Sequence, residues 1–421
     1  MTQPATHSGS SPSLPPASRP YAMRWIVILA LLTALGPLSI DMYLPALPVM
    51  ATDLAVDTAV VANSLPAYFF GLALGQLIYG PISDRIGRKL PLYFGLSLFV
   101  VASLACTFAG DIAVLFVARF FQALGGCVGV VMARAAIRDT LSVADSAQAY
   151  SMLMLVMGVA PILAPMLGSA LLLWTGWQGI FALLVAVGVI CLLLVHFYFK
   201  ESLAPQARRH LTVSQVFSTY WDLLKDHRFR TPALAGGLLG AAMFTYISAA
   251  SELFIDHFGV SAQHFAWIFG LNALGLIILS QLNGRLVKRV GLLRLLHVGA
   301  SIQSFGALFL LALALSGHST LWTTMFGLFC VVSGVGFTGP NATAIALAAQ
   351  GQRAGMASAL VGALQFGFGL LAGLALYVLP MDLTLAMSTV IIVLIGVGLT
   401  AVYVLRWREH KVLPPLPPTG A

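Results

Sequence analysis

Two charged residues, Asp41 and Arg119, lie deep inside long apolar segments of this 421-residue chain. Asp41 lies about nine residues before the end of one run near Met50, and Arg119 lies about eight residues after Asp111, where another run begins. At about 1.5 Å per helical residue, antiparallel helices would place both residues roughly 12–14 Å from the same end. Burial and a neighbouring cation act in opposite directions on a carboxyl group, and such a balance allows it to exchange a proton. A purely structural ion pair is the alternative.

The composition indicates that membrane-spanning helices position these two charges. Hydrophobic residues make up 59% of the chain and charged residues only 9%, whereas soluble domains carry about 25% charged residues. Apolar runs of about 20 residues, each long enough to cross a bilayer as a helix, recur along the whole chain. We therefore predict an all-α integral membrane protein. Its twelve spans are expected at about 24–49, 60–81, 90–110, 112–134, 147–172, 177–199, 232–255, 265–285, 292–315, 320–346, 354–378 and 384–406.

Basic residues accumulate on one side of this arrangement. Every Lys and Arg except Arg119 falls at the ends of the chain or in loops on that side. The loops on the other side contain no basic residue but carry Asp53, Asp57, Asp111, Asp256 and Asp382. The positive-inside rule then predicts that both termini and the 200–231 loop are cytoplasmic. The net charge of +8 reflects this topology and does not indicate nucleic-acid binding.

The 200–231 loop is the only long polar connection, and it divides the spans six and six. We predict a disordered cytoplasmic tail over residues 1–23, a six-helix bundle over 24–199 and a cytoplasmic linker over 200–231. A second six-helix bundle over 232–406 and a cytoplasmic tail over 407–421 complete the chain.

Corresponding loops of the two halves share a pattern. "GPISDRIG" starts at Gly80 and "GRLVKRVG" starts at Gly284; both have glycine at offsets 0 and 7 and charges at offsets 4 and 5. Each loop joins the second and third spans of its half, so we predict a duplicated six-span unit, as in many transporters. In the first loop, Gly80 and Gly87 would allow a tight turn and close helix approach. Asp84 could pair with a neighbouring Arg, and we expect this loop to act as a latch.

The pattern Gly-x-x-x-Asp-Arg-x-Gly-Arg-Lys in this loop resembles the signature of the major facilitator superfamily. "PLSIDMYLPALP" (37–48), "GQLIYGPISDRIGRK" (75–89), "RFFQALGG" (119–126) and "GVAPILAPMLG" (158–168) narrow the resemblance to the Bcr/CflA drug–proton antiporters. "PNATAIAL" (340–347) and "GMASALVGALQFGFG" (355–369) extend it into the second half. The resemblance covers roughly residues 24–406.

This resemblance implies the major facilitator fold, with twelve helices in two six-helix pseudo-repeats, in a bacterial inner membrane. It also implies a proton-coupled multidrug antiporter that exports small apolar or weakly polar compounds by alternating access. Asp41 would be its proton site and Arg119 the charge partner of Asp41. The expected partners are a drug or metabolite, protons and the lipid bilayer. A monomer is expected, without cofactor, metal ion or nucleic acid.

Two other functions remain as alternatives. The chain could be a proton-coupled symporter, or an exporter of a small metabolite. A stripe of small residues and prolines in the fifth span, from Gly158 to Gly168, resembles an antiporter motif and argues against a symporter. A membrane enzyme would need a metal or nucleophile constellation, and the sequence contains none.

Small residues and prolines form that stripe at a spacing of three, four and three residues from Gly158 to Gly168. Glycines allow close helix packing, and prolines favour bending. The stripe resembles the antiporter motif that packs between the two halves, with a merely kinked helix as the alternative. Together with the loop residues, the predicted gating set is Gly80, Asp84, Arg85, Gly87, Arg88, Arg134, Gly158, Pro161, Pro165 and Gly168.

The substrate pocket should be largely apolar with a few polar groups. A buried amide needs a hydrogen-bond partner, so the Asn and Gln candidates are favoured, whereas a Met or Phe is more often a packing residue. The candidates are Met42, Tyr43, Tyr68, Gln122, Met154, Met157, Phe244, Asn272, Asn341, Gln365 and Phe366.

Glu252 departs from the pattern of related sequences, which tend to have Ser-Pro-Phe where this chain reads Ser-Glu-Leu. A solvated interfacial acid is favoured, and a second carboxylate that binds cations or protons is the alternative. The four cysteines lie far apart in apolar spans and are expected to be buried thiols. "GVGFTG" (334–339) lies in a membrane helix without the strand that a nucleotide site needs.

Overall fold

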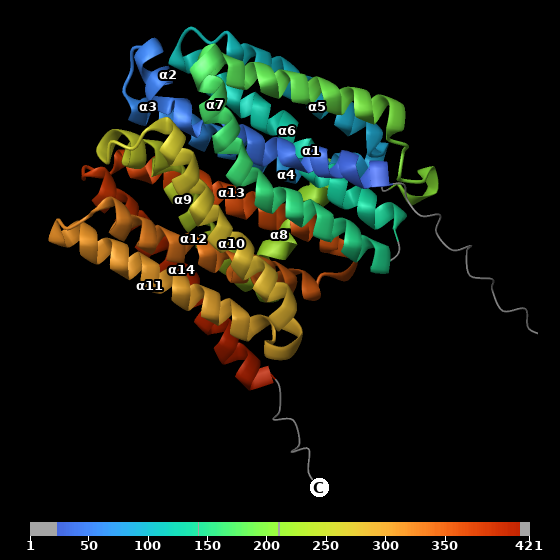
Figure 1. The fold of residues 1–421 in the computed structure, drawn as a ribbon. Coiled ribbons are helices and arrows are strands. Elements are labelled where there is room, and N and C mark those ends of the chain that lie inside the picture. The colour runs from blue at the N-terminus through green and yellow to red at the C-terminus, as the bar shows by residue number, and fades with distance from the viewer. Residues whose placement is uncertain (1–22, 142, 209–210, 413–421) are drawn as a thin grey trace, which may run out of the picture.

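The computed structural model describes residues 23–141, 143–208 and 211–412, and within these ranges the regular elements are all helical (Figure 1). The predicted tail over 1–23 lies outside the described residues except for Met23. In the first half the elements are α1 (Met23–Asp41), η1 (Leu44–Ala46), α2 (Leu47–Asp53), α3 (Thr58–Ala62), α4 (Ser64–Ile86), α5 (Lys89–Thr107), α6 (Ile112–Thr140) and α7 (Val143–Tyr198).

A connection with helices of its own leads to the second half. It contains η2 (Pro205–Ala207) and α8 (Val213–Lys225). The second half consists of α9 (His227–Ser251), η3 (Glu252–His257), α10 (Ala262–Val290), α11 (Leu292–Ser316), α12 (Leu321–Ala348), η4 (Gly351–Arg353), α13 (Ala354–Val378) and α14 (Leu383–Val412).

Eleven helices of the described residues are long and apolar enough to cross a membrane, and one of them accounts for two crossings. The apolar part of α7, Leu155–Tyr198, has 44 residues and would measure about 66 Å as a straight helix, more than twice the roughly 30 Å hydrocarbon core. It is broken at Gly176, whose φ of 67° is not helical. The chain therefore crosses the membrane twelve times, as predicted, and the helix edges fall within a few residues of the predicted ones.

Polar residues begin the helices at one side of the membrane. Asp111 accepts a hydrogen bond from the backbone N–H of Val114 at the start of α6. Ser261 caps α10 in the same way, and Thr320 forms a reciprocal capping pair with Thr323 at the start of α12. These side chains satisfy amide groups that have no partner within the helix. We call this side the acidic side and the opposite side, which carries α8, the basic side.

The two halves pack face to face along their length. Helices α1–α7 form one body and α9–α14 the other (Figure 1). They meet mainly where α4 contacts α13 and where α7 contacts α10. On the acidic side, η1, α2 and α3 also contact α9, α10 and η3.

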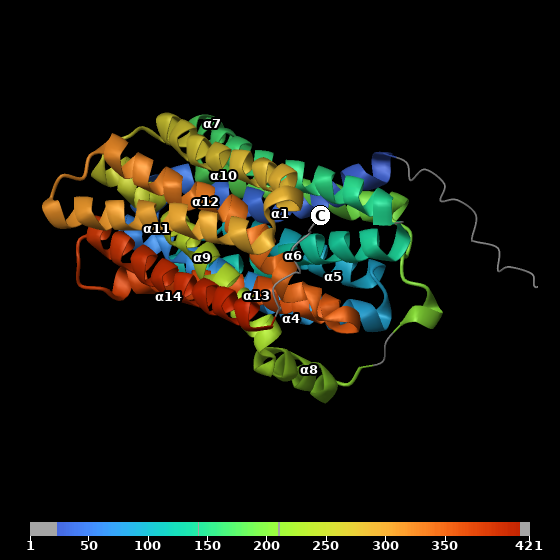
Figure 2. The same cartoon turned by 90° about the horizontal axis from the view of Figure 1, so that it is seen from below.

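The predicted linker over 200–231 is only partly irregular. Helix α8 begins with a capping pair between Thr212 and Gln215, and α9 already begins at His227, five residues before the predicted start of the second bundle. Viewed from below, α8 lies outside the bundle beside the ends of α4 and α13 (Figure 2). Helix α14 also continues to Val412, past the predicted start of the C-terminal tail at 407. The sequence prediction missed α8 and the extended ends of α9 and α14 because it followed membrane-length apolar runs and not amphipathic patterns.

The repeated loops end their helices in the same way. Gly87 after α4 has φ 101° and Gly291 after α10 has φ 90°, in the region that favours glycine. The first glycines, Gly80 and Gly284, lie inside these helices. A Cβ on Gly80 would make only an ordinary 3.8 Å contact with Ala359, and one on Gly284 would meet nothing within 4 Å. Gly80 therefore makes no helix approach closer than ordinary contact, whereas the tight turn that its partner Gly87 was predicted to allow is present.

Candidate functional site

A cavity of about 380 Å³ lies between the two halves. Its lining comes from α1, α4, α6, α7, α9, α10, α12 and α13, and most of it is apolar. The cavity extends from Asp41 to Arg134. On α6 its lining runs from Gly126, near the middle of the helix, to Arg134, which lies toward the basic side. The polar lining side chains are Asp41, Gln76, Arg134, Tyr246, Asn272, Ser280, Gln281 and Gln365.

Asp41 is the carboxylate in the wall of this cavity. It is the last residue of α1, a helix interrupted by Pro37, and it is only 4% exposed. Tyr246 of α9, in the other half, also lines this cavity. Among the described residues, Asp41 takes part in no ion pair.

Arg119 is fully buried in α6, away from the cavity lining. Its Nη1 donates to Oε1 of Gln122 at 2.6 Å, and Nε2 of Gln122 donates to Ser103 Oγ at 2.8 Å. The guanidinium carbon lies 4.2 Å from the ring centroids of both Tyr43 and Tyr68. Its Nε and Nη2 have no hydrogen-bond partner within the described residues. Three cation–π contacts, the third with Phe181 at 5.8 Å, and one charged hydrogen bond to Gln122 therefore hold this cation, and no carboxylate of the described residues pairs with it.

Asp41 and Arg119, which were expected to influence each other directly or through water, form no direct ion pair within the described residues. Asp41 lines the cavity, whereas Tyr43, in the turn that follows α1, contacts the guanidinium of Arg119. Tyr43 is itself held by a 3.0 Å hydrogen bond between its hydroxyl and Ser64 Oγ.

Five of the predicted substrate residues line the cavity: Met157, Phe244, Asn272, Gln365 and Phe366. Asn272 Nδ2 donates to the Tyr246 hydroxyl at 3.1 Å, and its Oδ1 has no partner within the described residues. Asn272 thus presents an unused acceptor at the cavity wall.

The other predicted substrate residues lie elsewhere. Tyr43, Tyr68 and Gln122 surround Arg119, and Met42 is buried against α7. Asn341 donates to Asn283 Oδ1 at 2.6 Å and to Phe337 O at 2.8 Å, so its amide bridges α12 to α10 and does not line the cavity. The side chain of Met154 lies outside the described part of the chain.

Sequence reasoning missed four polar residues of the lining: Gln76, Tyr246, Ser280 and Gln281. Gln76 in α4 could have been found by the argument used for the other buried amides, because it lies one turn before Gly80 in an apolar span. A Cβ on Gly362 of α13 would lie 3.1 Å from Gln76 Oε1. Gln76 therefore lies where the two halves touch.

Aromatic rings of both halves meet beside the cavity. Phe69 of α4 lies 4.8 Å from Phe244 of α9 and 6.5 Å from Phe366 of α13, measured between ring centroids. Phe244 and Phe366 are 5.4 Å apart. These rings supply the apolar surface that a weakly polar compound needs.

Arg88 is the centre of the charged loop. It is 2% exposed, and its Nη1 lies 2.6 Å from Asp84 Oδ1 while its Nε lies 2.8 Å from Asp139 Oδ2. The predicted pairing of Asp84 with a neighbouring Arg is therefore confirmed, whereas Arg85 is exposed. The second repeat carries Lys288 where the first has Asp84, and within the described residues it makes no comparable ion pair.

Glu201 holds the turn that follows Gly87. It accepts hydrogen bonds from the backbone N–H groups of Arg88 and Lys89 at 2.9–3.1 Å. A Cβ on Gly87 would lie 2.5 Å from Glu201 Oε2. Burial raises the pKa of Glu201, but these N–H donors and Arg208 outweigh that effect and hold the pKa below its usual value. The network joins α4, α5, α6 and the end of α7, all within the first half.

The stripe of the fifth span packs on both halves. A Cβ on Gly158 would lie 3.1 Å from Ile277 of α10, across the interface, and Pro161 lines the cavity. Pro165 is buried. A Cβ on Gly168 would overlap the carbonyl oxygen of Met42. The stripe therefore joins the interface between the halves to the end of α1, next to Asp41.

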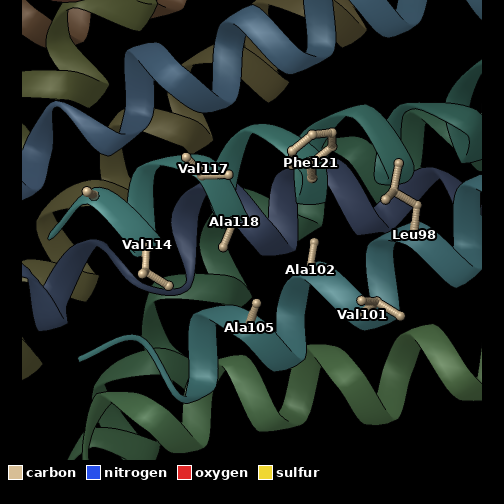
Figure 3. A pocket seen from close by; sticks show the side chains of 9 residues that line it. Leu98, Val101, Ala102, Ala105, Val114, Val117, Ala118 and Phe121 are labelled. Atoms are coloured by element: carbon tan, nitrogen blue, oxygen red, sulfur yellow. The ribbon is translucent and has the colours of Figure 1, made fainter. Parts of the chain in front are cut away.

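A second hollow of about 530 Å³ lies on the outside of α5 and α6. Its labelled side chains, from Leu98 to Phe121, are all apolar (Figure 3), and Val101 and Val117 are exposed. Without a polar group it offers no chemistry. It belongs to the surface that faces lipid.

A model of the Major Facilitator Superfamily matches residues 29–373. The chain belongs to the major facilitator superfamily. It is 36% identical to the uncharacterized MFS-type transporter YdgK of Bacillus subtilis (strain 168), over 81% of this chain and 85% of the relative. It is 28% identical to the bicyclomycin resistance protein homolog of Haemophilus influenzae, over 92% of this chain and 97% of the relative, which confirms the resemblance to Bcr/CflA proteins.

The solved structure of a D-xylose–proton symporter shares this fold, with a TM-score of 0.71 over 91% of this chain and 97% of the symporter. At 14% sequence identity, the likeness shows the fold alone. This member of the superfamily is a multi-pass transporter of small molecules and not an enzyme.

Proposed function

We propose that this transporter exports small apolar or weakly polar compounds in exchange for protons, with Asp41 as the proton site. The observation that carries this proposal is the position of Asp41, a buried carboxylate in the wall of a largely apolar central cavity. An ionisable group at membrane depth is costly and is a functional-site hypothesis by default. The relative named for bicyclomycin resistance supports the substrate class.

One carboxylate can serve both partners of an exchange. When ionised, Asp41 places a negative charge in its part of the cavity wall, and this charge favours a compound with a polar group. When protonated, it is neutral and favours loss of that compound. Because proton and compound use the same cavity, binding of one lowers the affinity for the other.

Arg119 is proposed to act on Asp41 through Tyr43. The Tyr43 ring covers the guanidinium at 4.2 Å and lies two residues from Asp41 in the same turn of chain. Movement of this turn during alternating access would therefore shift the proton site and the buried cation together. The unpartnered Nε and Nη2 of Arg119 leave donors for a second arrangement of the site.

The transport cycle is proposed to use the Arg88 network and the α7 stripe as its gating elements, with Arg134 at the basic end of the cavity. We propose that the basic side is cytoplasmic and that a monomer acts in a bacterial inner membrane. An even number of crossings brings the start of α1 and the end of α14 to the same side of the membrane, and the loops on that side carry the Lys and Arg residues that retain a segment in the cytoplasm.

The test is expression in an efflux-deficient bacterial host challenged with a broad toxin panel. The proposal predicts growth protection against some compounds, lower cell content of those compounds, and loss of both effects when a protonophore collapses the proton gradient. Protection that survives the protonophore, or increased uptake of a sugar or acid, would contradict proton-driven export.

A further inference from the structure

Helix α8 has apolar residues on two adjacent faces, and the protein covers only one of them. Tyr220 and Leu223 are buried in a cluster with Phe229 of α9 and with Met356 and Leu360 of α13. The adjacent stripe of Val213, Phe217 and Trp221 is 70%, 70% and 60% exposed. These three residues are spaced by four, so they lie along one side of the helix.

The polar residues of α8 occupy the remaining side. At 100° per residue, Ser214, Ser218 and Asp222 fall on the side away from the buried cluster, and all three are exposed. The buried face and the exposed stripe therefore form one continuous apolar surface on α8. Tyr220 and Leu223 pack against the helix bundle, whereas the exposed stripe faces the surroundings of the protein.

The position of α8 is fixed close to the boundary of the membrane. Only Asp226 separates the end of α8 at Lys225 from the start of the membrane-spanning α9. The Asp226 carboxylate accepts hydrogen bonds from the Arg228 N–H at 2.9 Å and from Gln350 Nε2 at 3.2 Å. The Tyr220 hydroxyl donates to the Leu77 carbonyl of α4 at 3.0 Å. These contacts hold the exposed stripe at the depth where α9 enters the bilayer.

We propose that α8 lies in the interfacial zone of the leaflet on the basic side, with Val213, Phe217 and Trp221 inserted among the upper acyl chains. An amphipathic helix with Trp and Phe on one face and Lys beside it binds membrane surfaces in this way. Lys225 Nζ lies 5.4 Å from the centre of the Trp221 ring, so the cation is placed above the apolar stripe and can reach lipid phosphates.

The surrounding charge identifies anionic lipid as the preferred occupant. Lys225, Arg228 and Arg230 are exposed around the junction of α8 and α9, and juxtamembrane basic residues attract negatively charged headgroups. The inference does not depend on the proposed transport activity, since it needs only a chain that spans a bilayer. Most of the α8 contacts are with α9 and α13, so the lipid would anchor the second half.

Tryptophan quenching in the full reconstituted chain tests this placement. The signal of Trp221 is obtained as the difference between the unsubstituted chain and a Trp221→Phe variant, in vesicles of phosphatidylcholine and phosphatidylglycerol. We expect lipids brominated on their upper acyl chains to quench this signal several-fold more than aqueous acrylamide does. In the matched variant with Trp221→Phe and Ser218→Trp, the tryptophan moves to the polar face, and the order of the two quenchers should reverse.

Two outcomes would overturn the proposal. Quenching of Trp221 by acrylamide and not by brominated lipid would place the stripe in water. Shielding from both quenchers in the purified protein would mean that a second copy of the chain covers it. Trp221→Phe and Ser218→Trp both alter exposed positions, so the variants should fold, and unchanged thermal unfolding checks that they do.

Discussion

Replacing Gly168 with alanine tests the packing that holds Asp41 in place. The added Cβ would overlap the Met42 carbonyl oxygen and lie 2.8 Å from its carbonyl carbon. Main-chain atoms cannot rotate aside, so α1 and α7 must move apart, and overpacking of this kind costs about 1–3 kcal/mol. We take the upper end and subtract the gain of about 1 kcal/mol for alanine over glycine in a helix. The expected net loss is about 2 kcal/mol of stability, together with slower transport.

The assay is thermal unfolding of the purified protein, followed by initial rates of export from proteoliposomes at a temperature where both proteins are folded. Gly396→Ala in α14 is the matched control, because a Cβ there meets nothing within 4 Å. It should be at least as stable as the unsubstituted chain and should transport normally. If Gly168→Ala behaved like this control, the close contact between α7 and the end of α1 would not position Asp41.

Four further substitutions, at three charged residues, test the charged groups. Arg119→Lys should retain part of the proton-driven transport, because Lys keeps the charge but loses planar stacking worth about 1–2 kcal/mol per buried ring. Arg119→Gln removes the charge and should retain almost no transport, and equal rates for the two variants would contradict this. Asp84→Asn should slow transport while changing compound affinity by no more than a few fold, a coupling of about 1 kcal/mol, and distances between labels on the two halves should shift; unchanged rates would make the loop a topology signal only. Glu201 has a lowered pKa, so its contact should stabilise the protein above the unfolded-state pKa and lose that effect as pH falls through the folded-state pKa. The stability difference between the unsubstituted chain and Glu201→Gln should therefore be present at neutral pH and shrink as the pH falls below the ordinary glutamate pKa of about 4.3, and a difference that is unchanged in strong acid would refute it.

The spans could be predicted from the sequence because a bilayer leaves few choices. A helix that must satisfy its backbone inside lipid needs about 20 apolar residues, and the chain carries such runs at regular intervals. The repeat was visible for a similar reason: Gly87 and Gly291 end their helices with positive φ, which few other residues tolerate. The spans and the repeated loops could both be predicted because each depends on residues that are close together in the sequence.

The site was only partly predictable because it depends on which face each helix presents. Counting residues along the two helices predicted a similar depth for Asp41 and Arg119, but it could not show that Arg119 would contact Tyr43 while Asp41 lines the cavity. Asn272 lines the cavity, whereas Asn341 is used to join α12 to α10. Both are buried amides in apolar spans, and only the packing of the halves separates them. Helix α8 was missed because its 13 residues are too few to resemble a membrane span and its apolar residues alternate with polar ones along the sequence.

The central claim is that Asp41 couples transport to protons, and the direct measurement is proton-driven export by Asp41→Asn in proteoliposomes with an imposed pH gradient. Asparagine keeps the size of the side chain but cannot exchange a proton. We predict that uphill export stops, while compound binding to the cavity persists and the unfolding temperature is little changed. Undiminished uphill export by a well-folded Asp41→Asn protein, with protons still moving in the opposite direction, would contradict the assignment of Asp41 as the proton site.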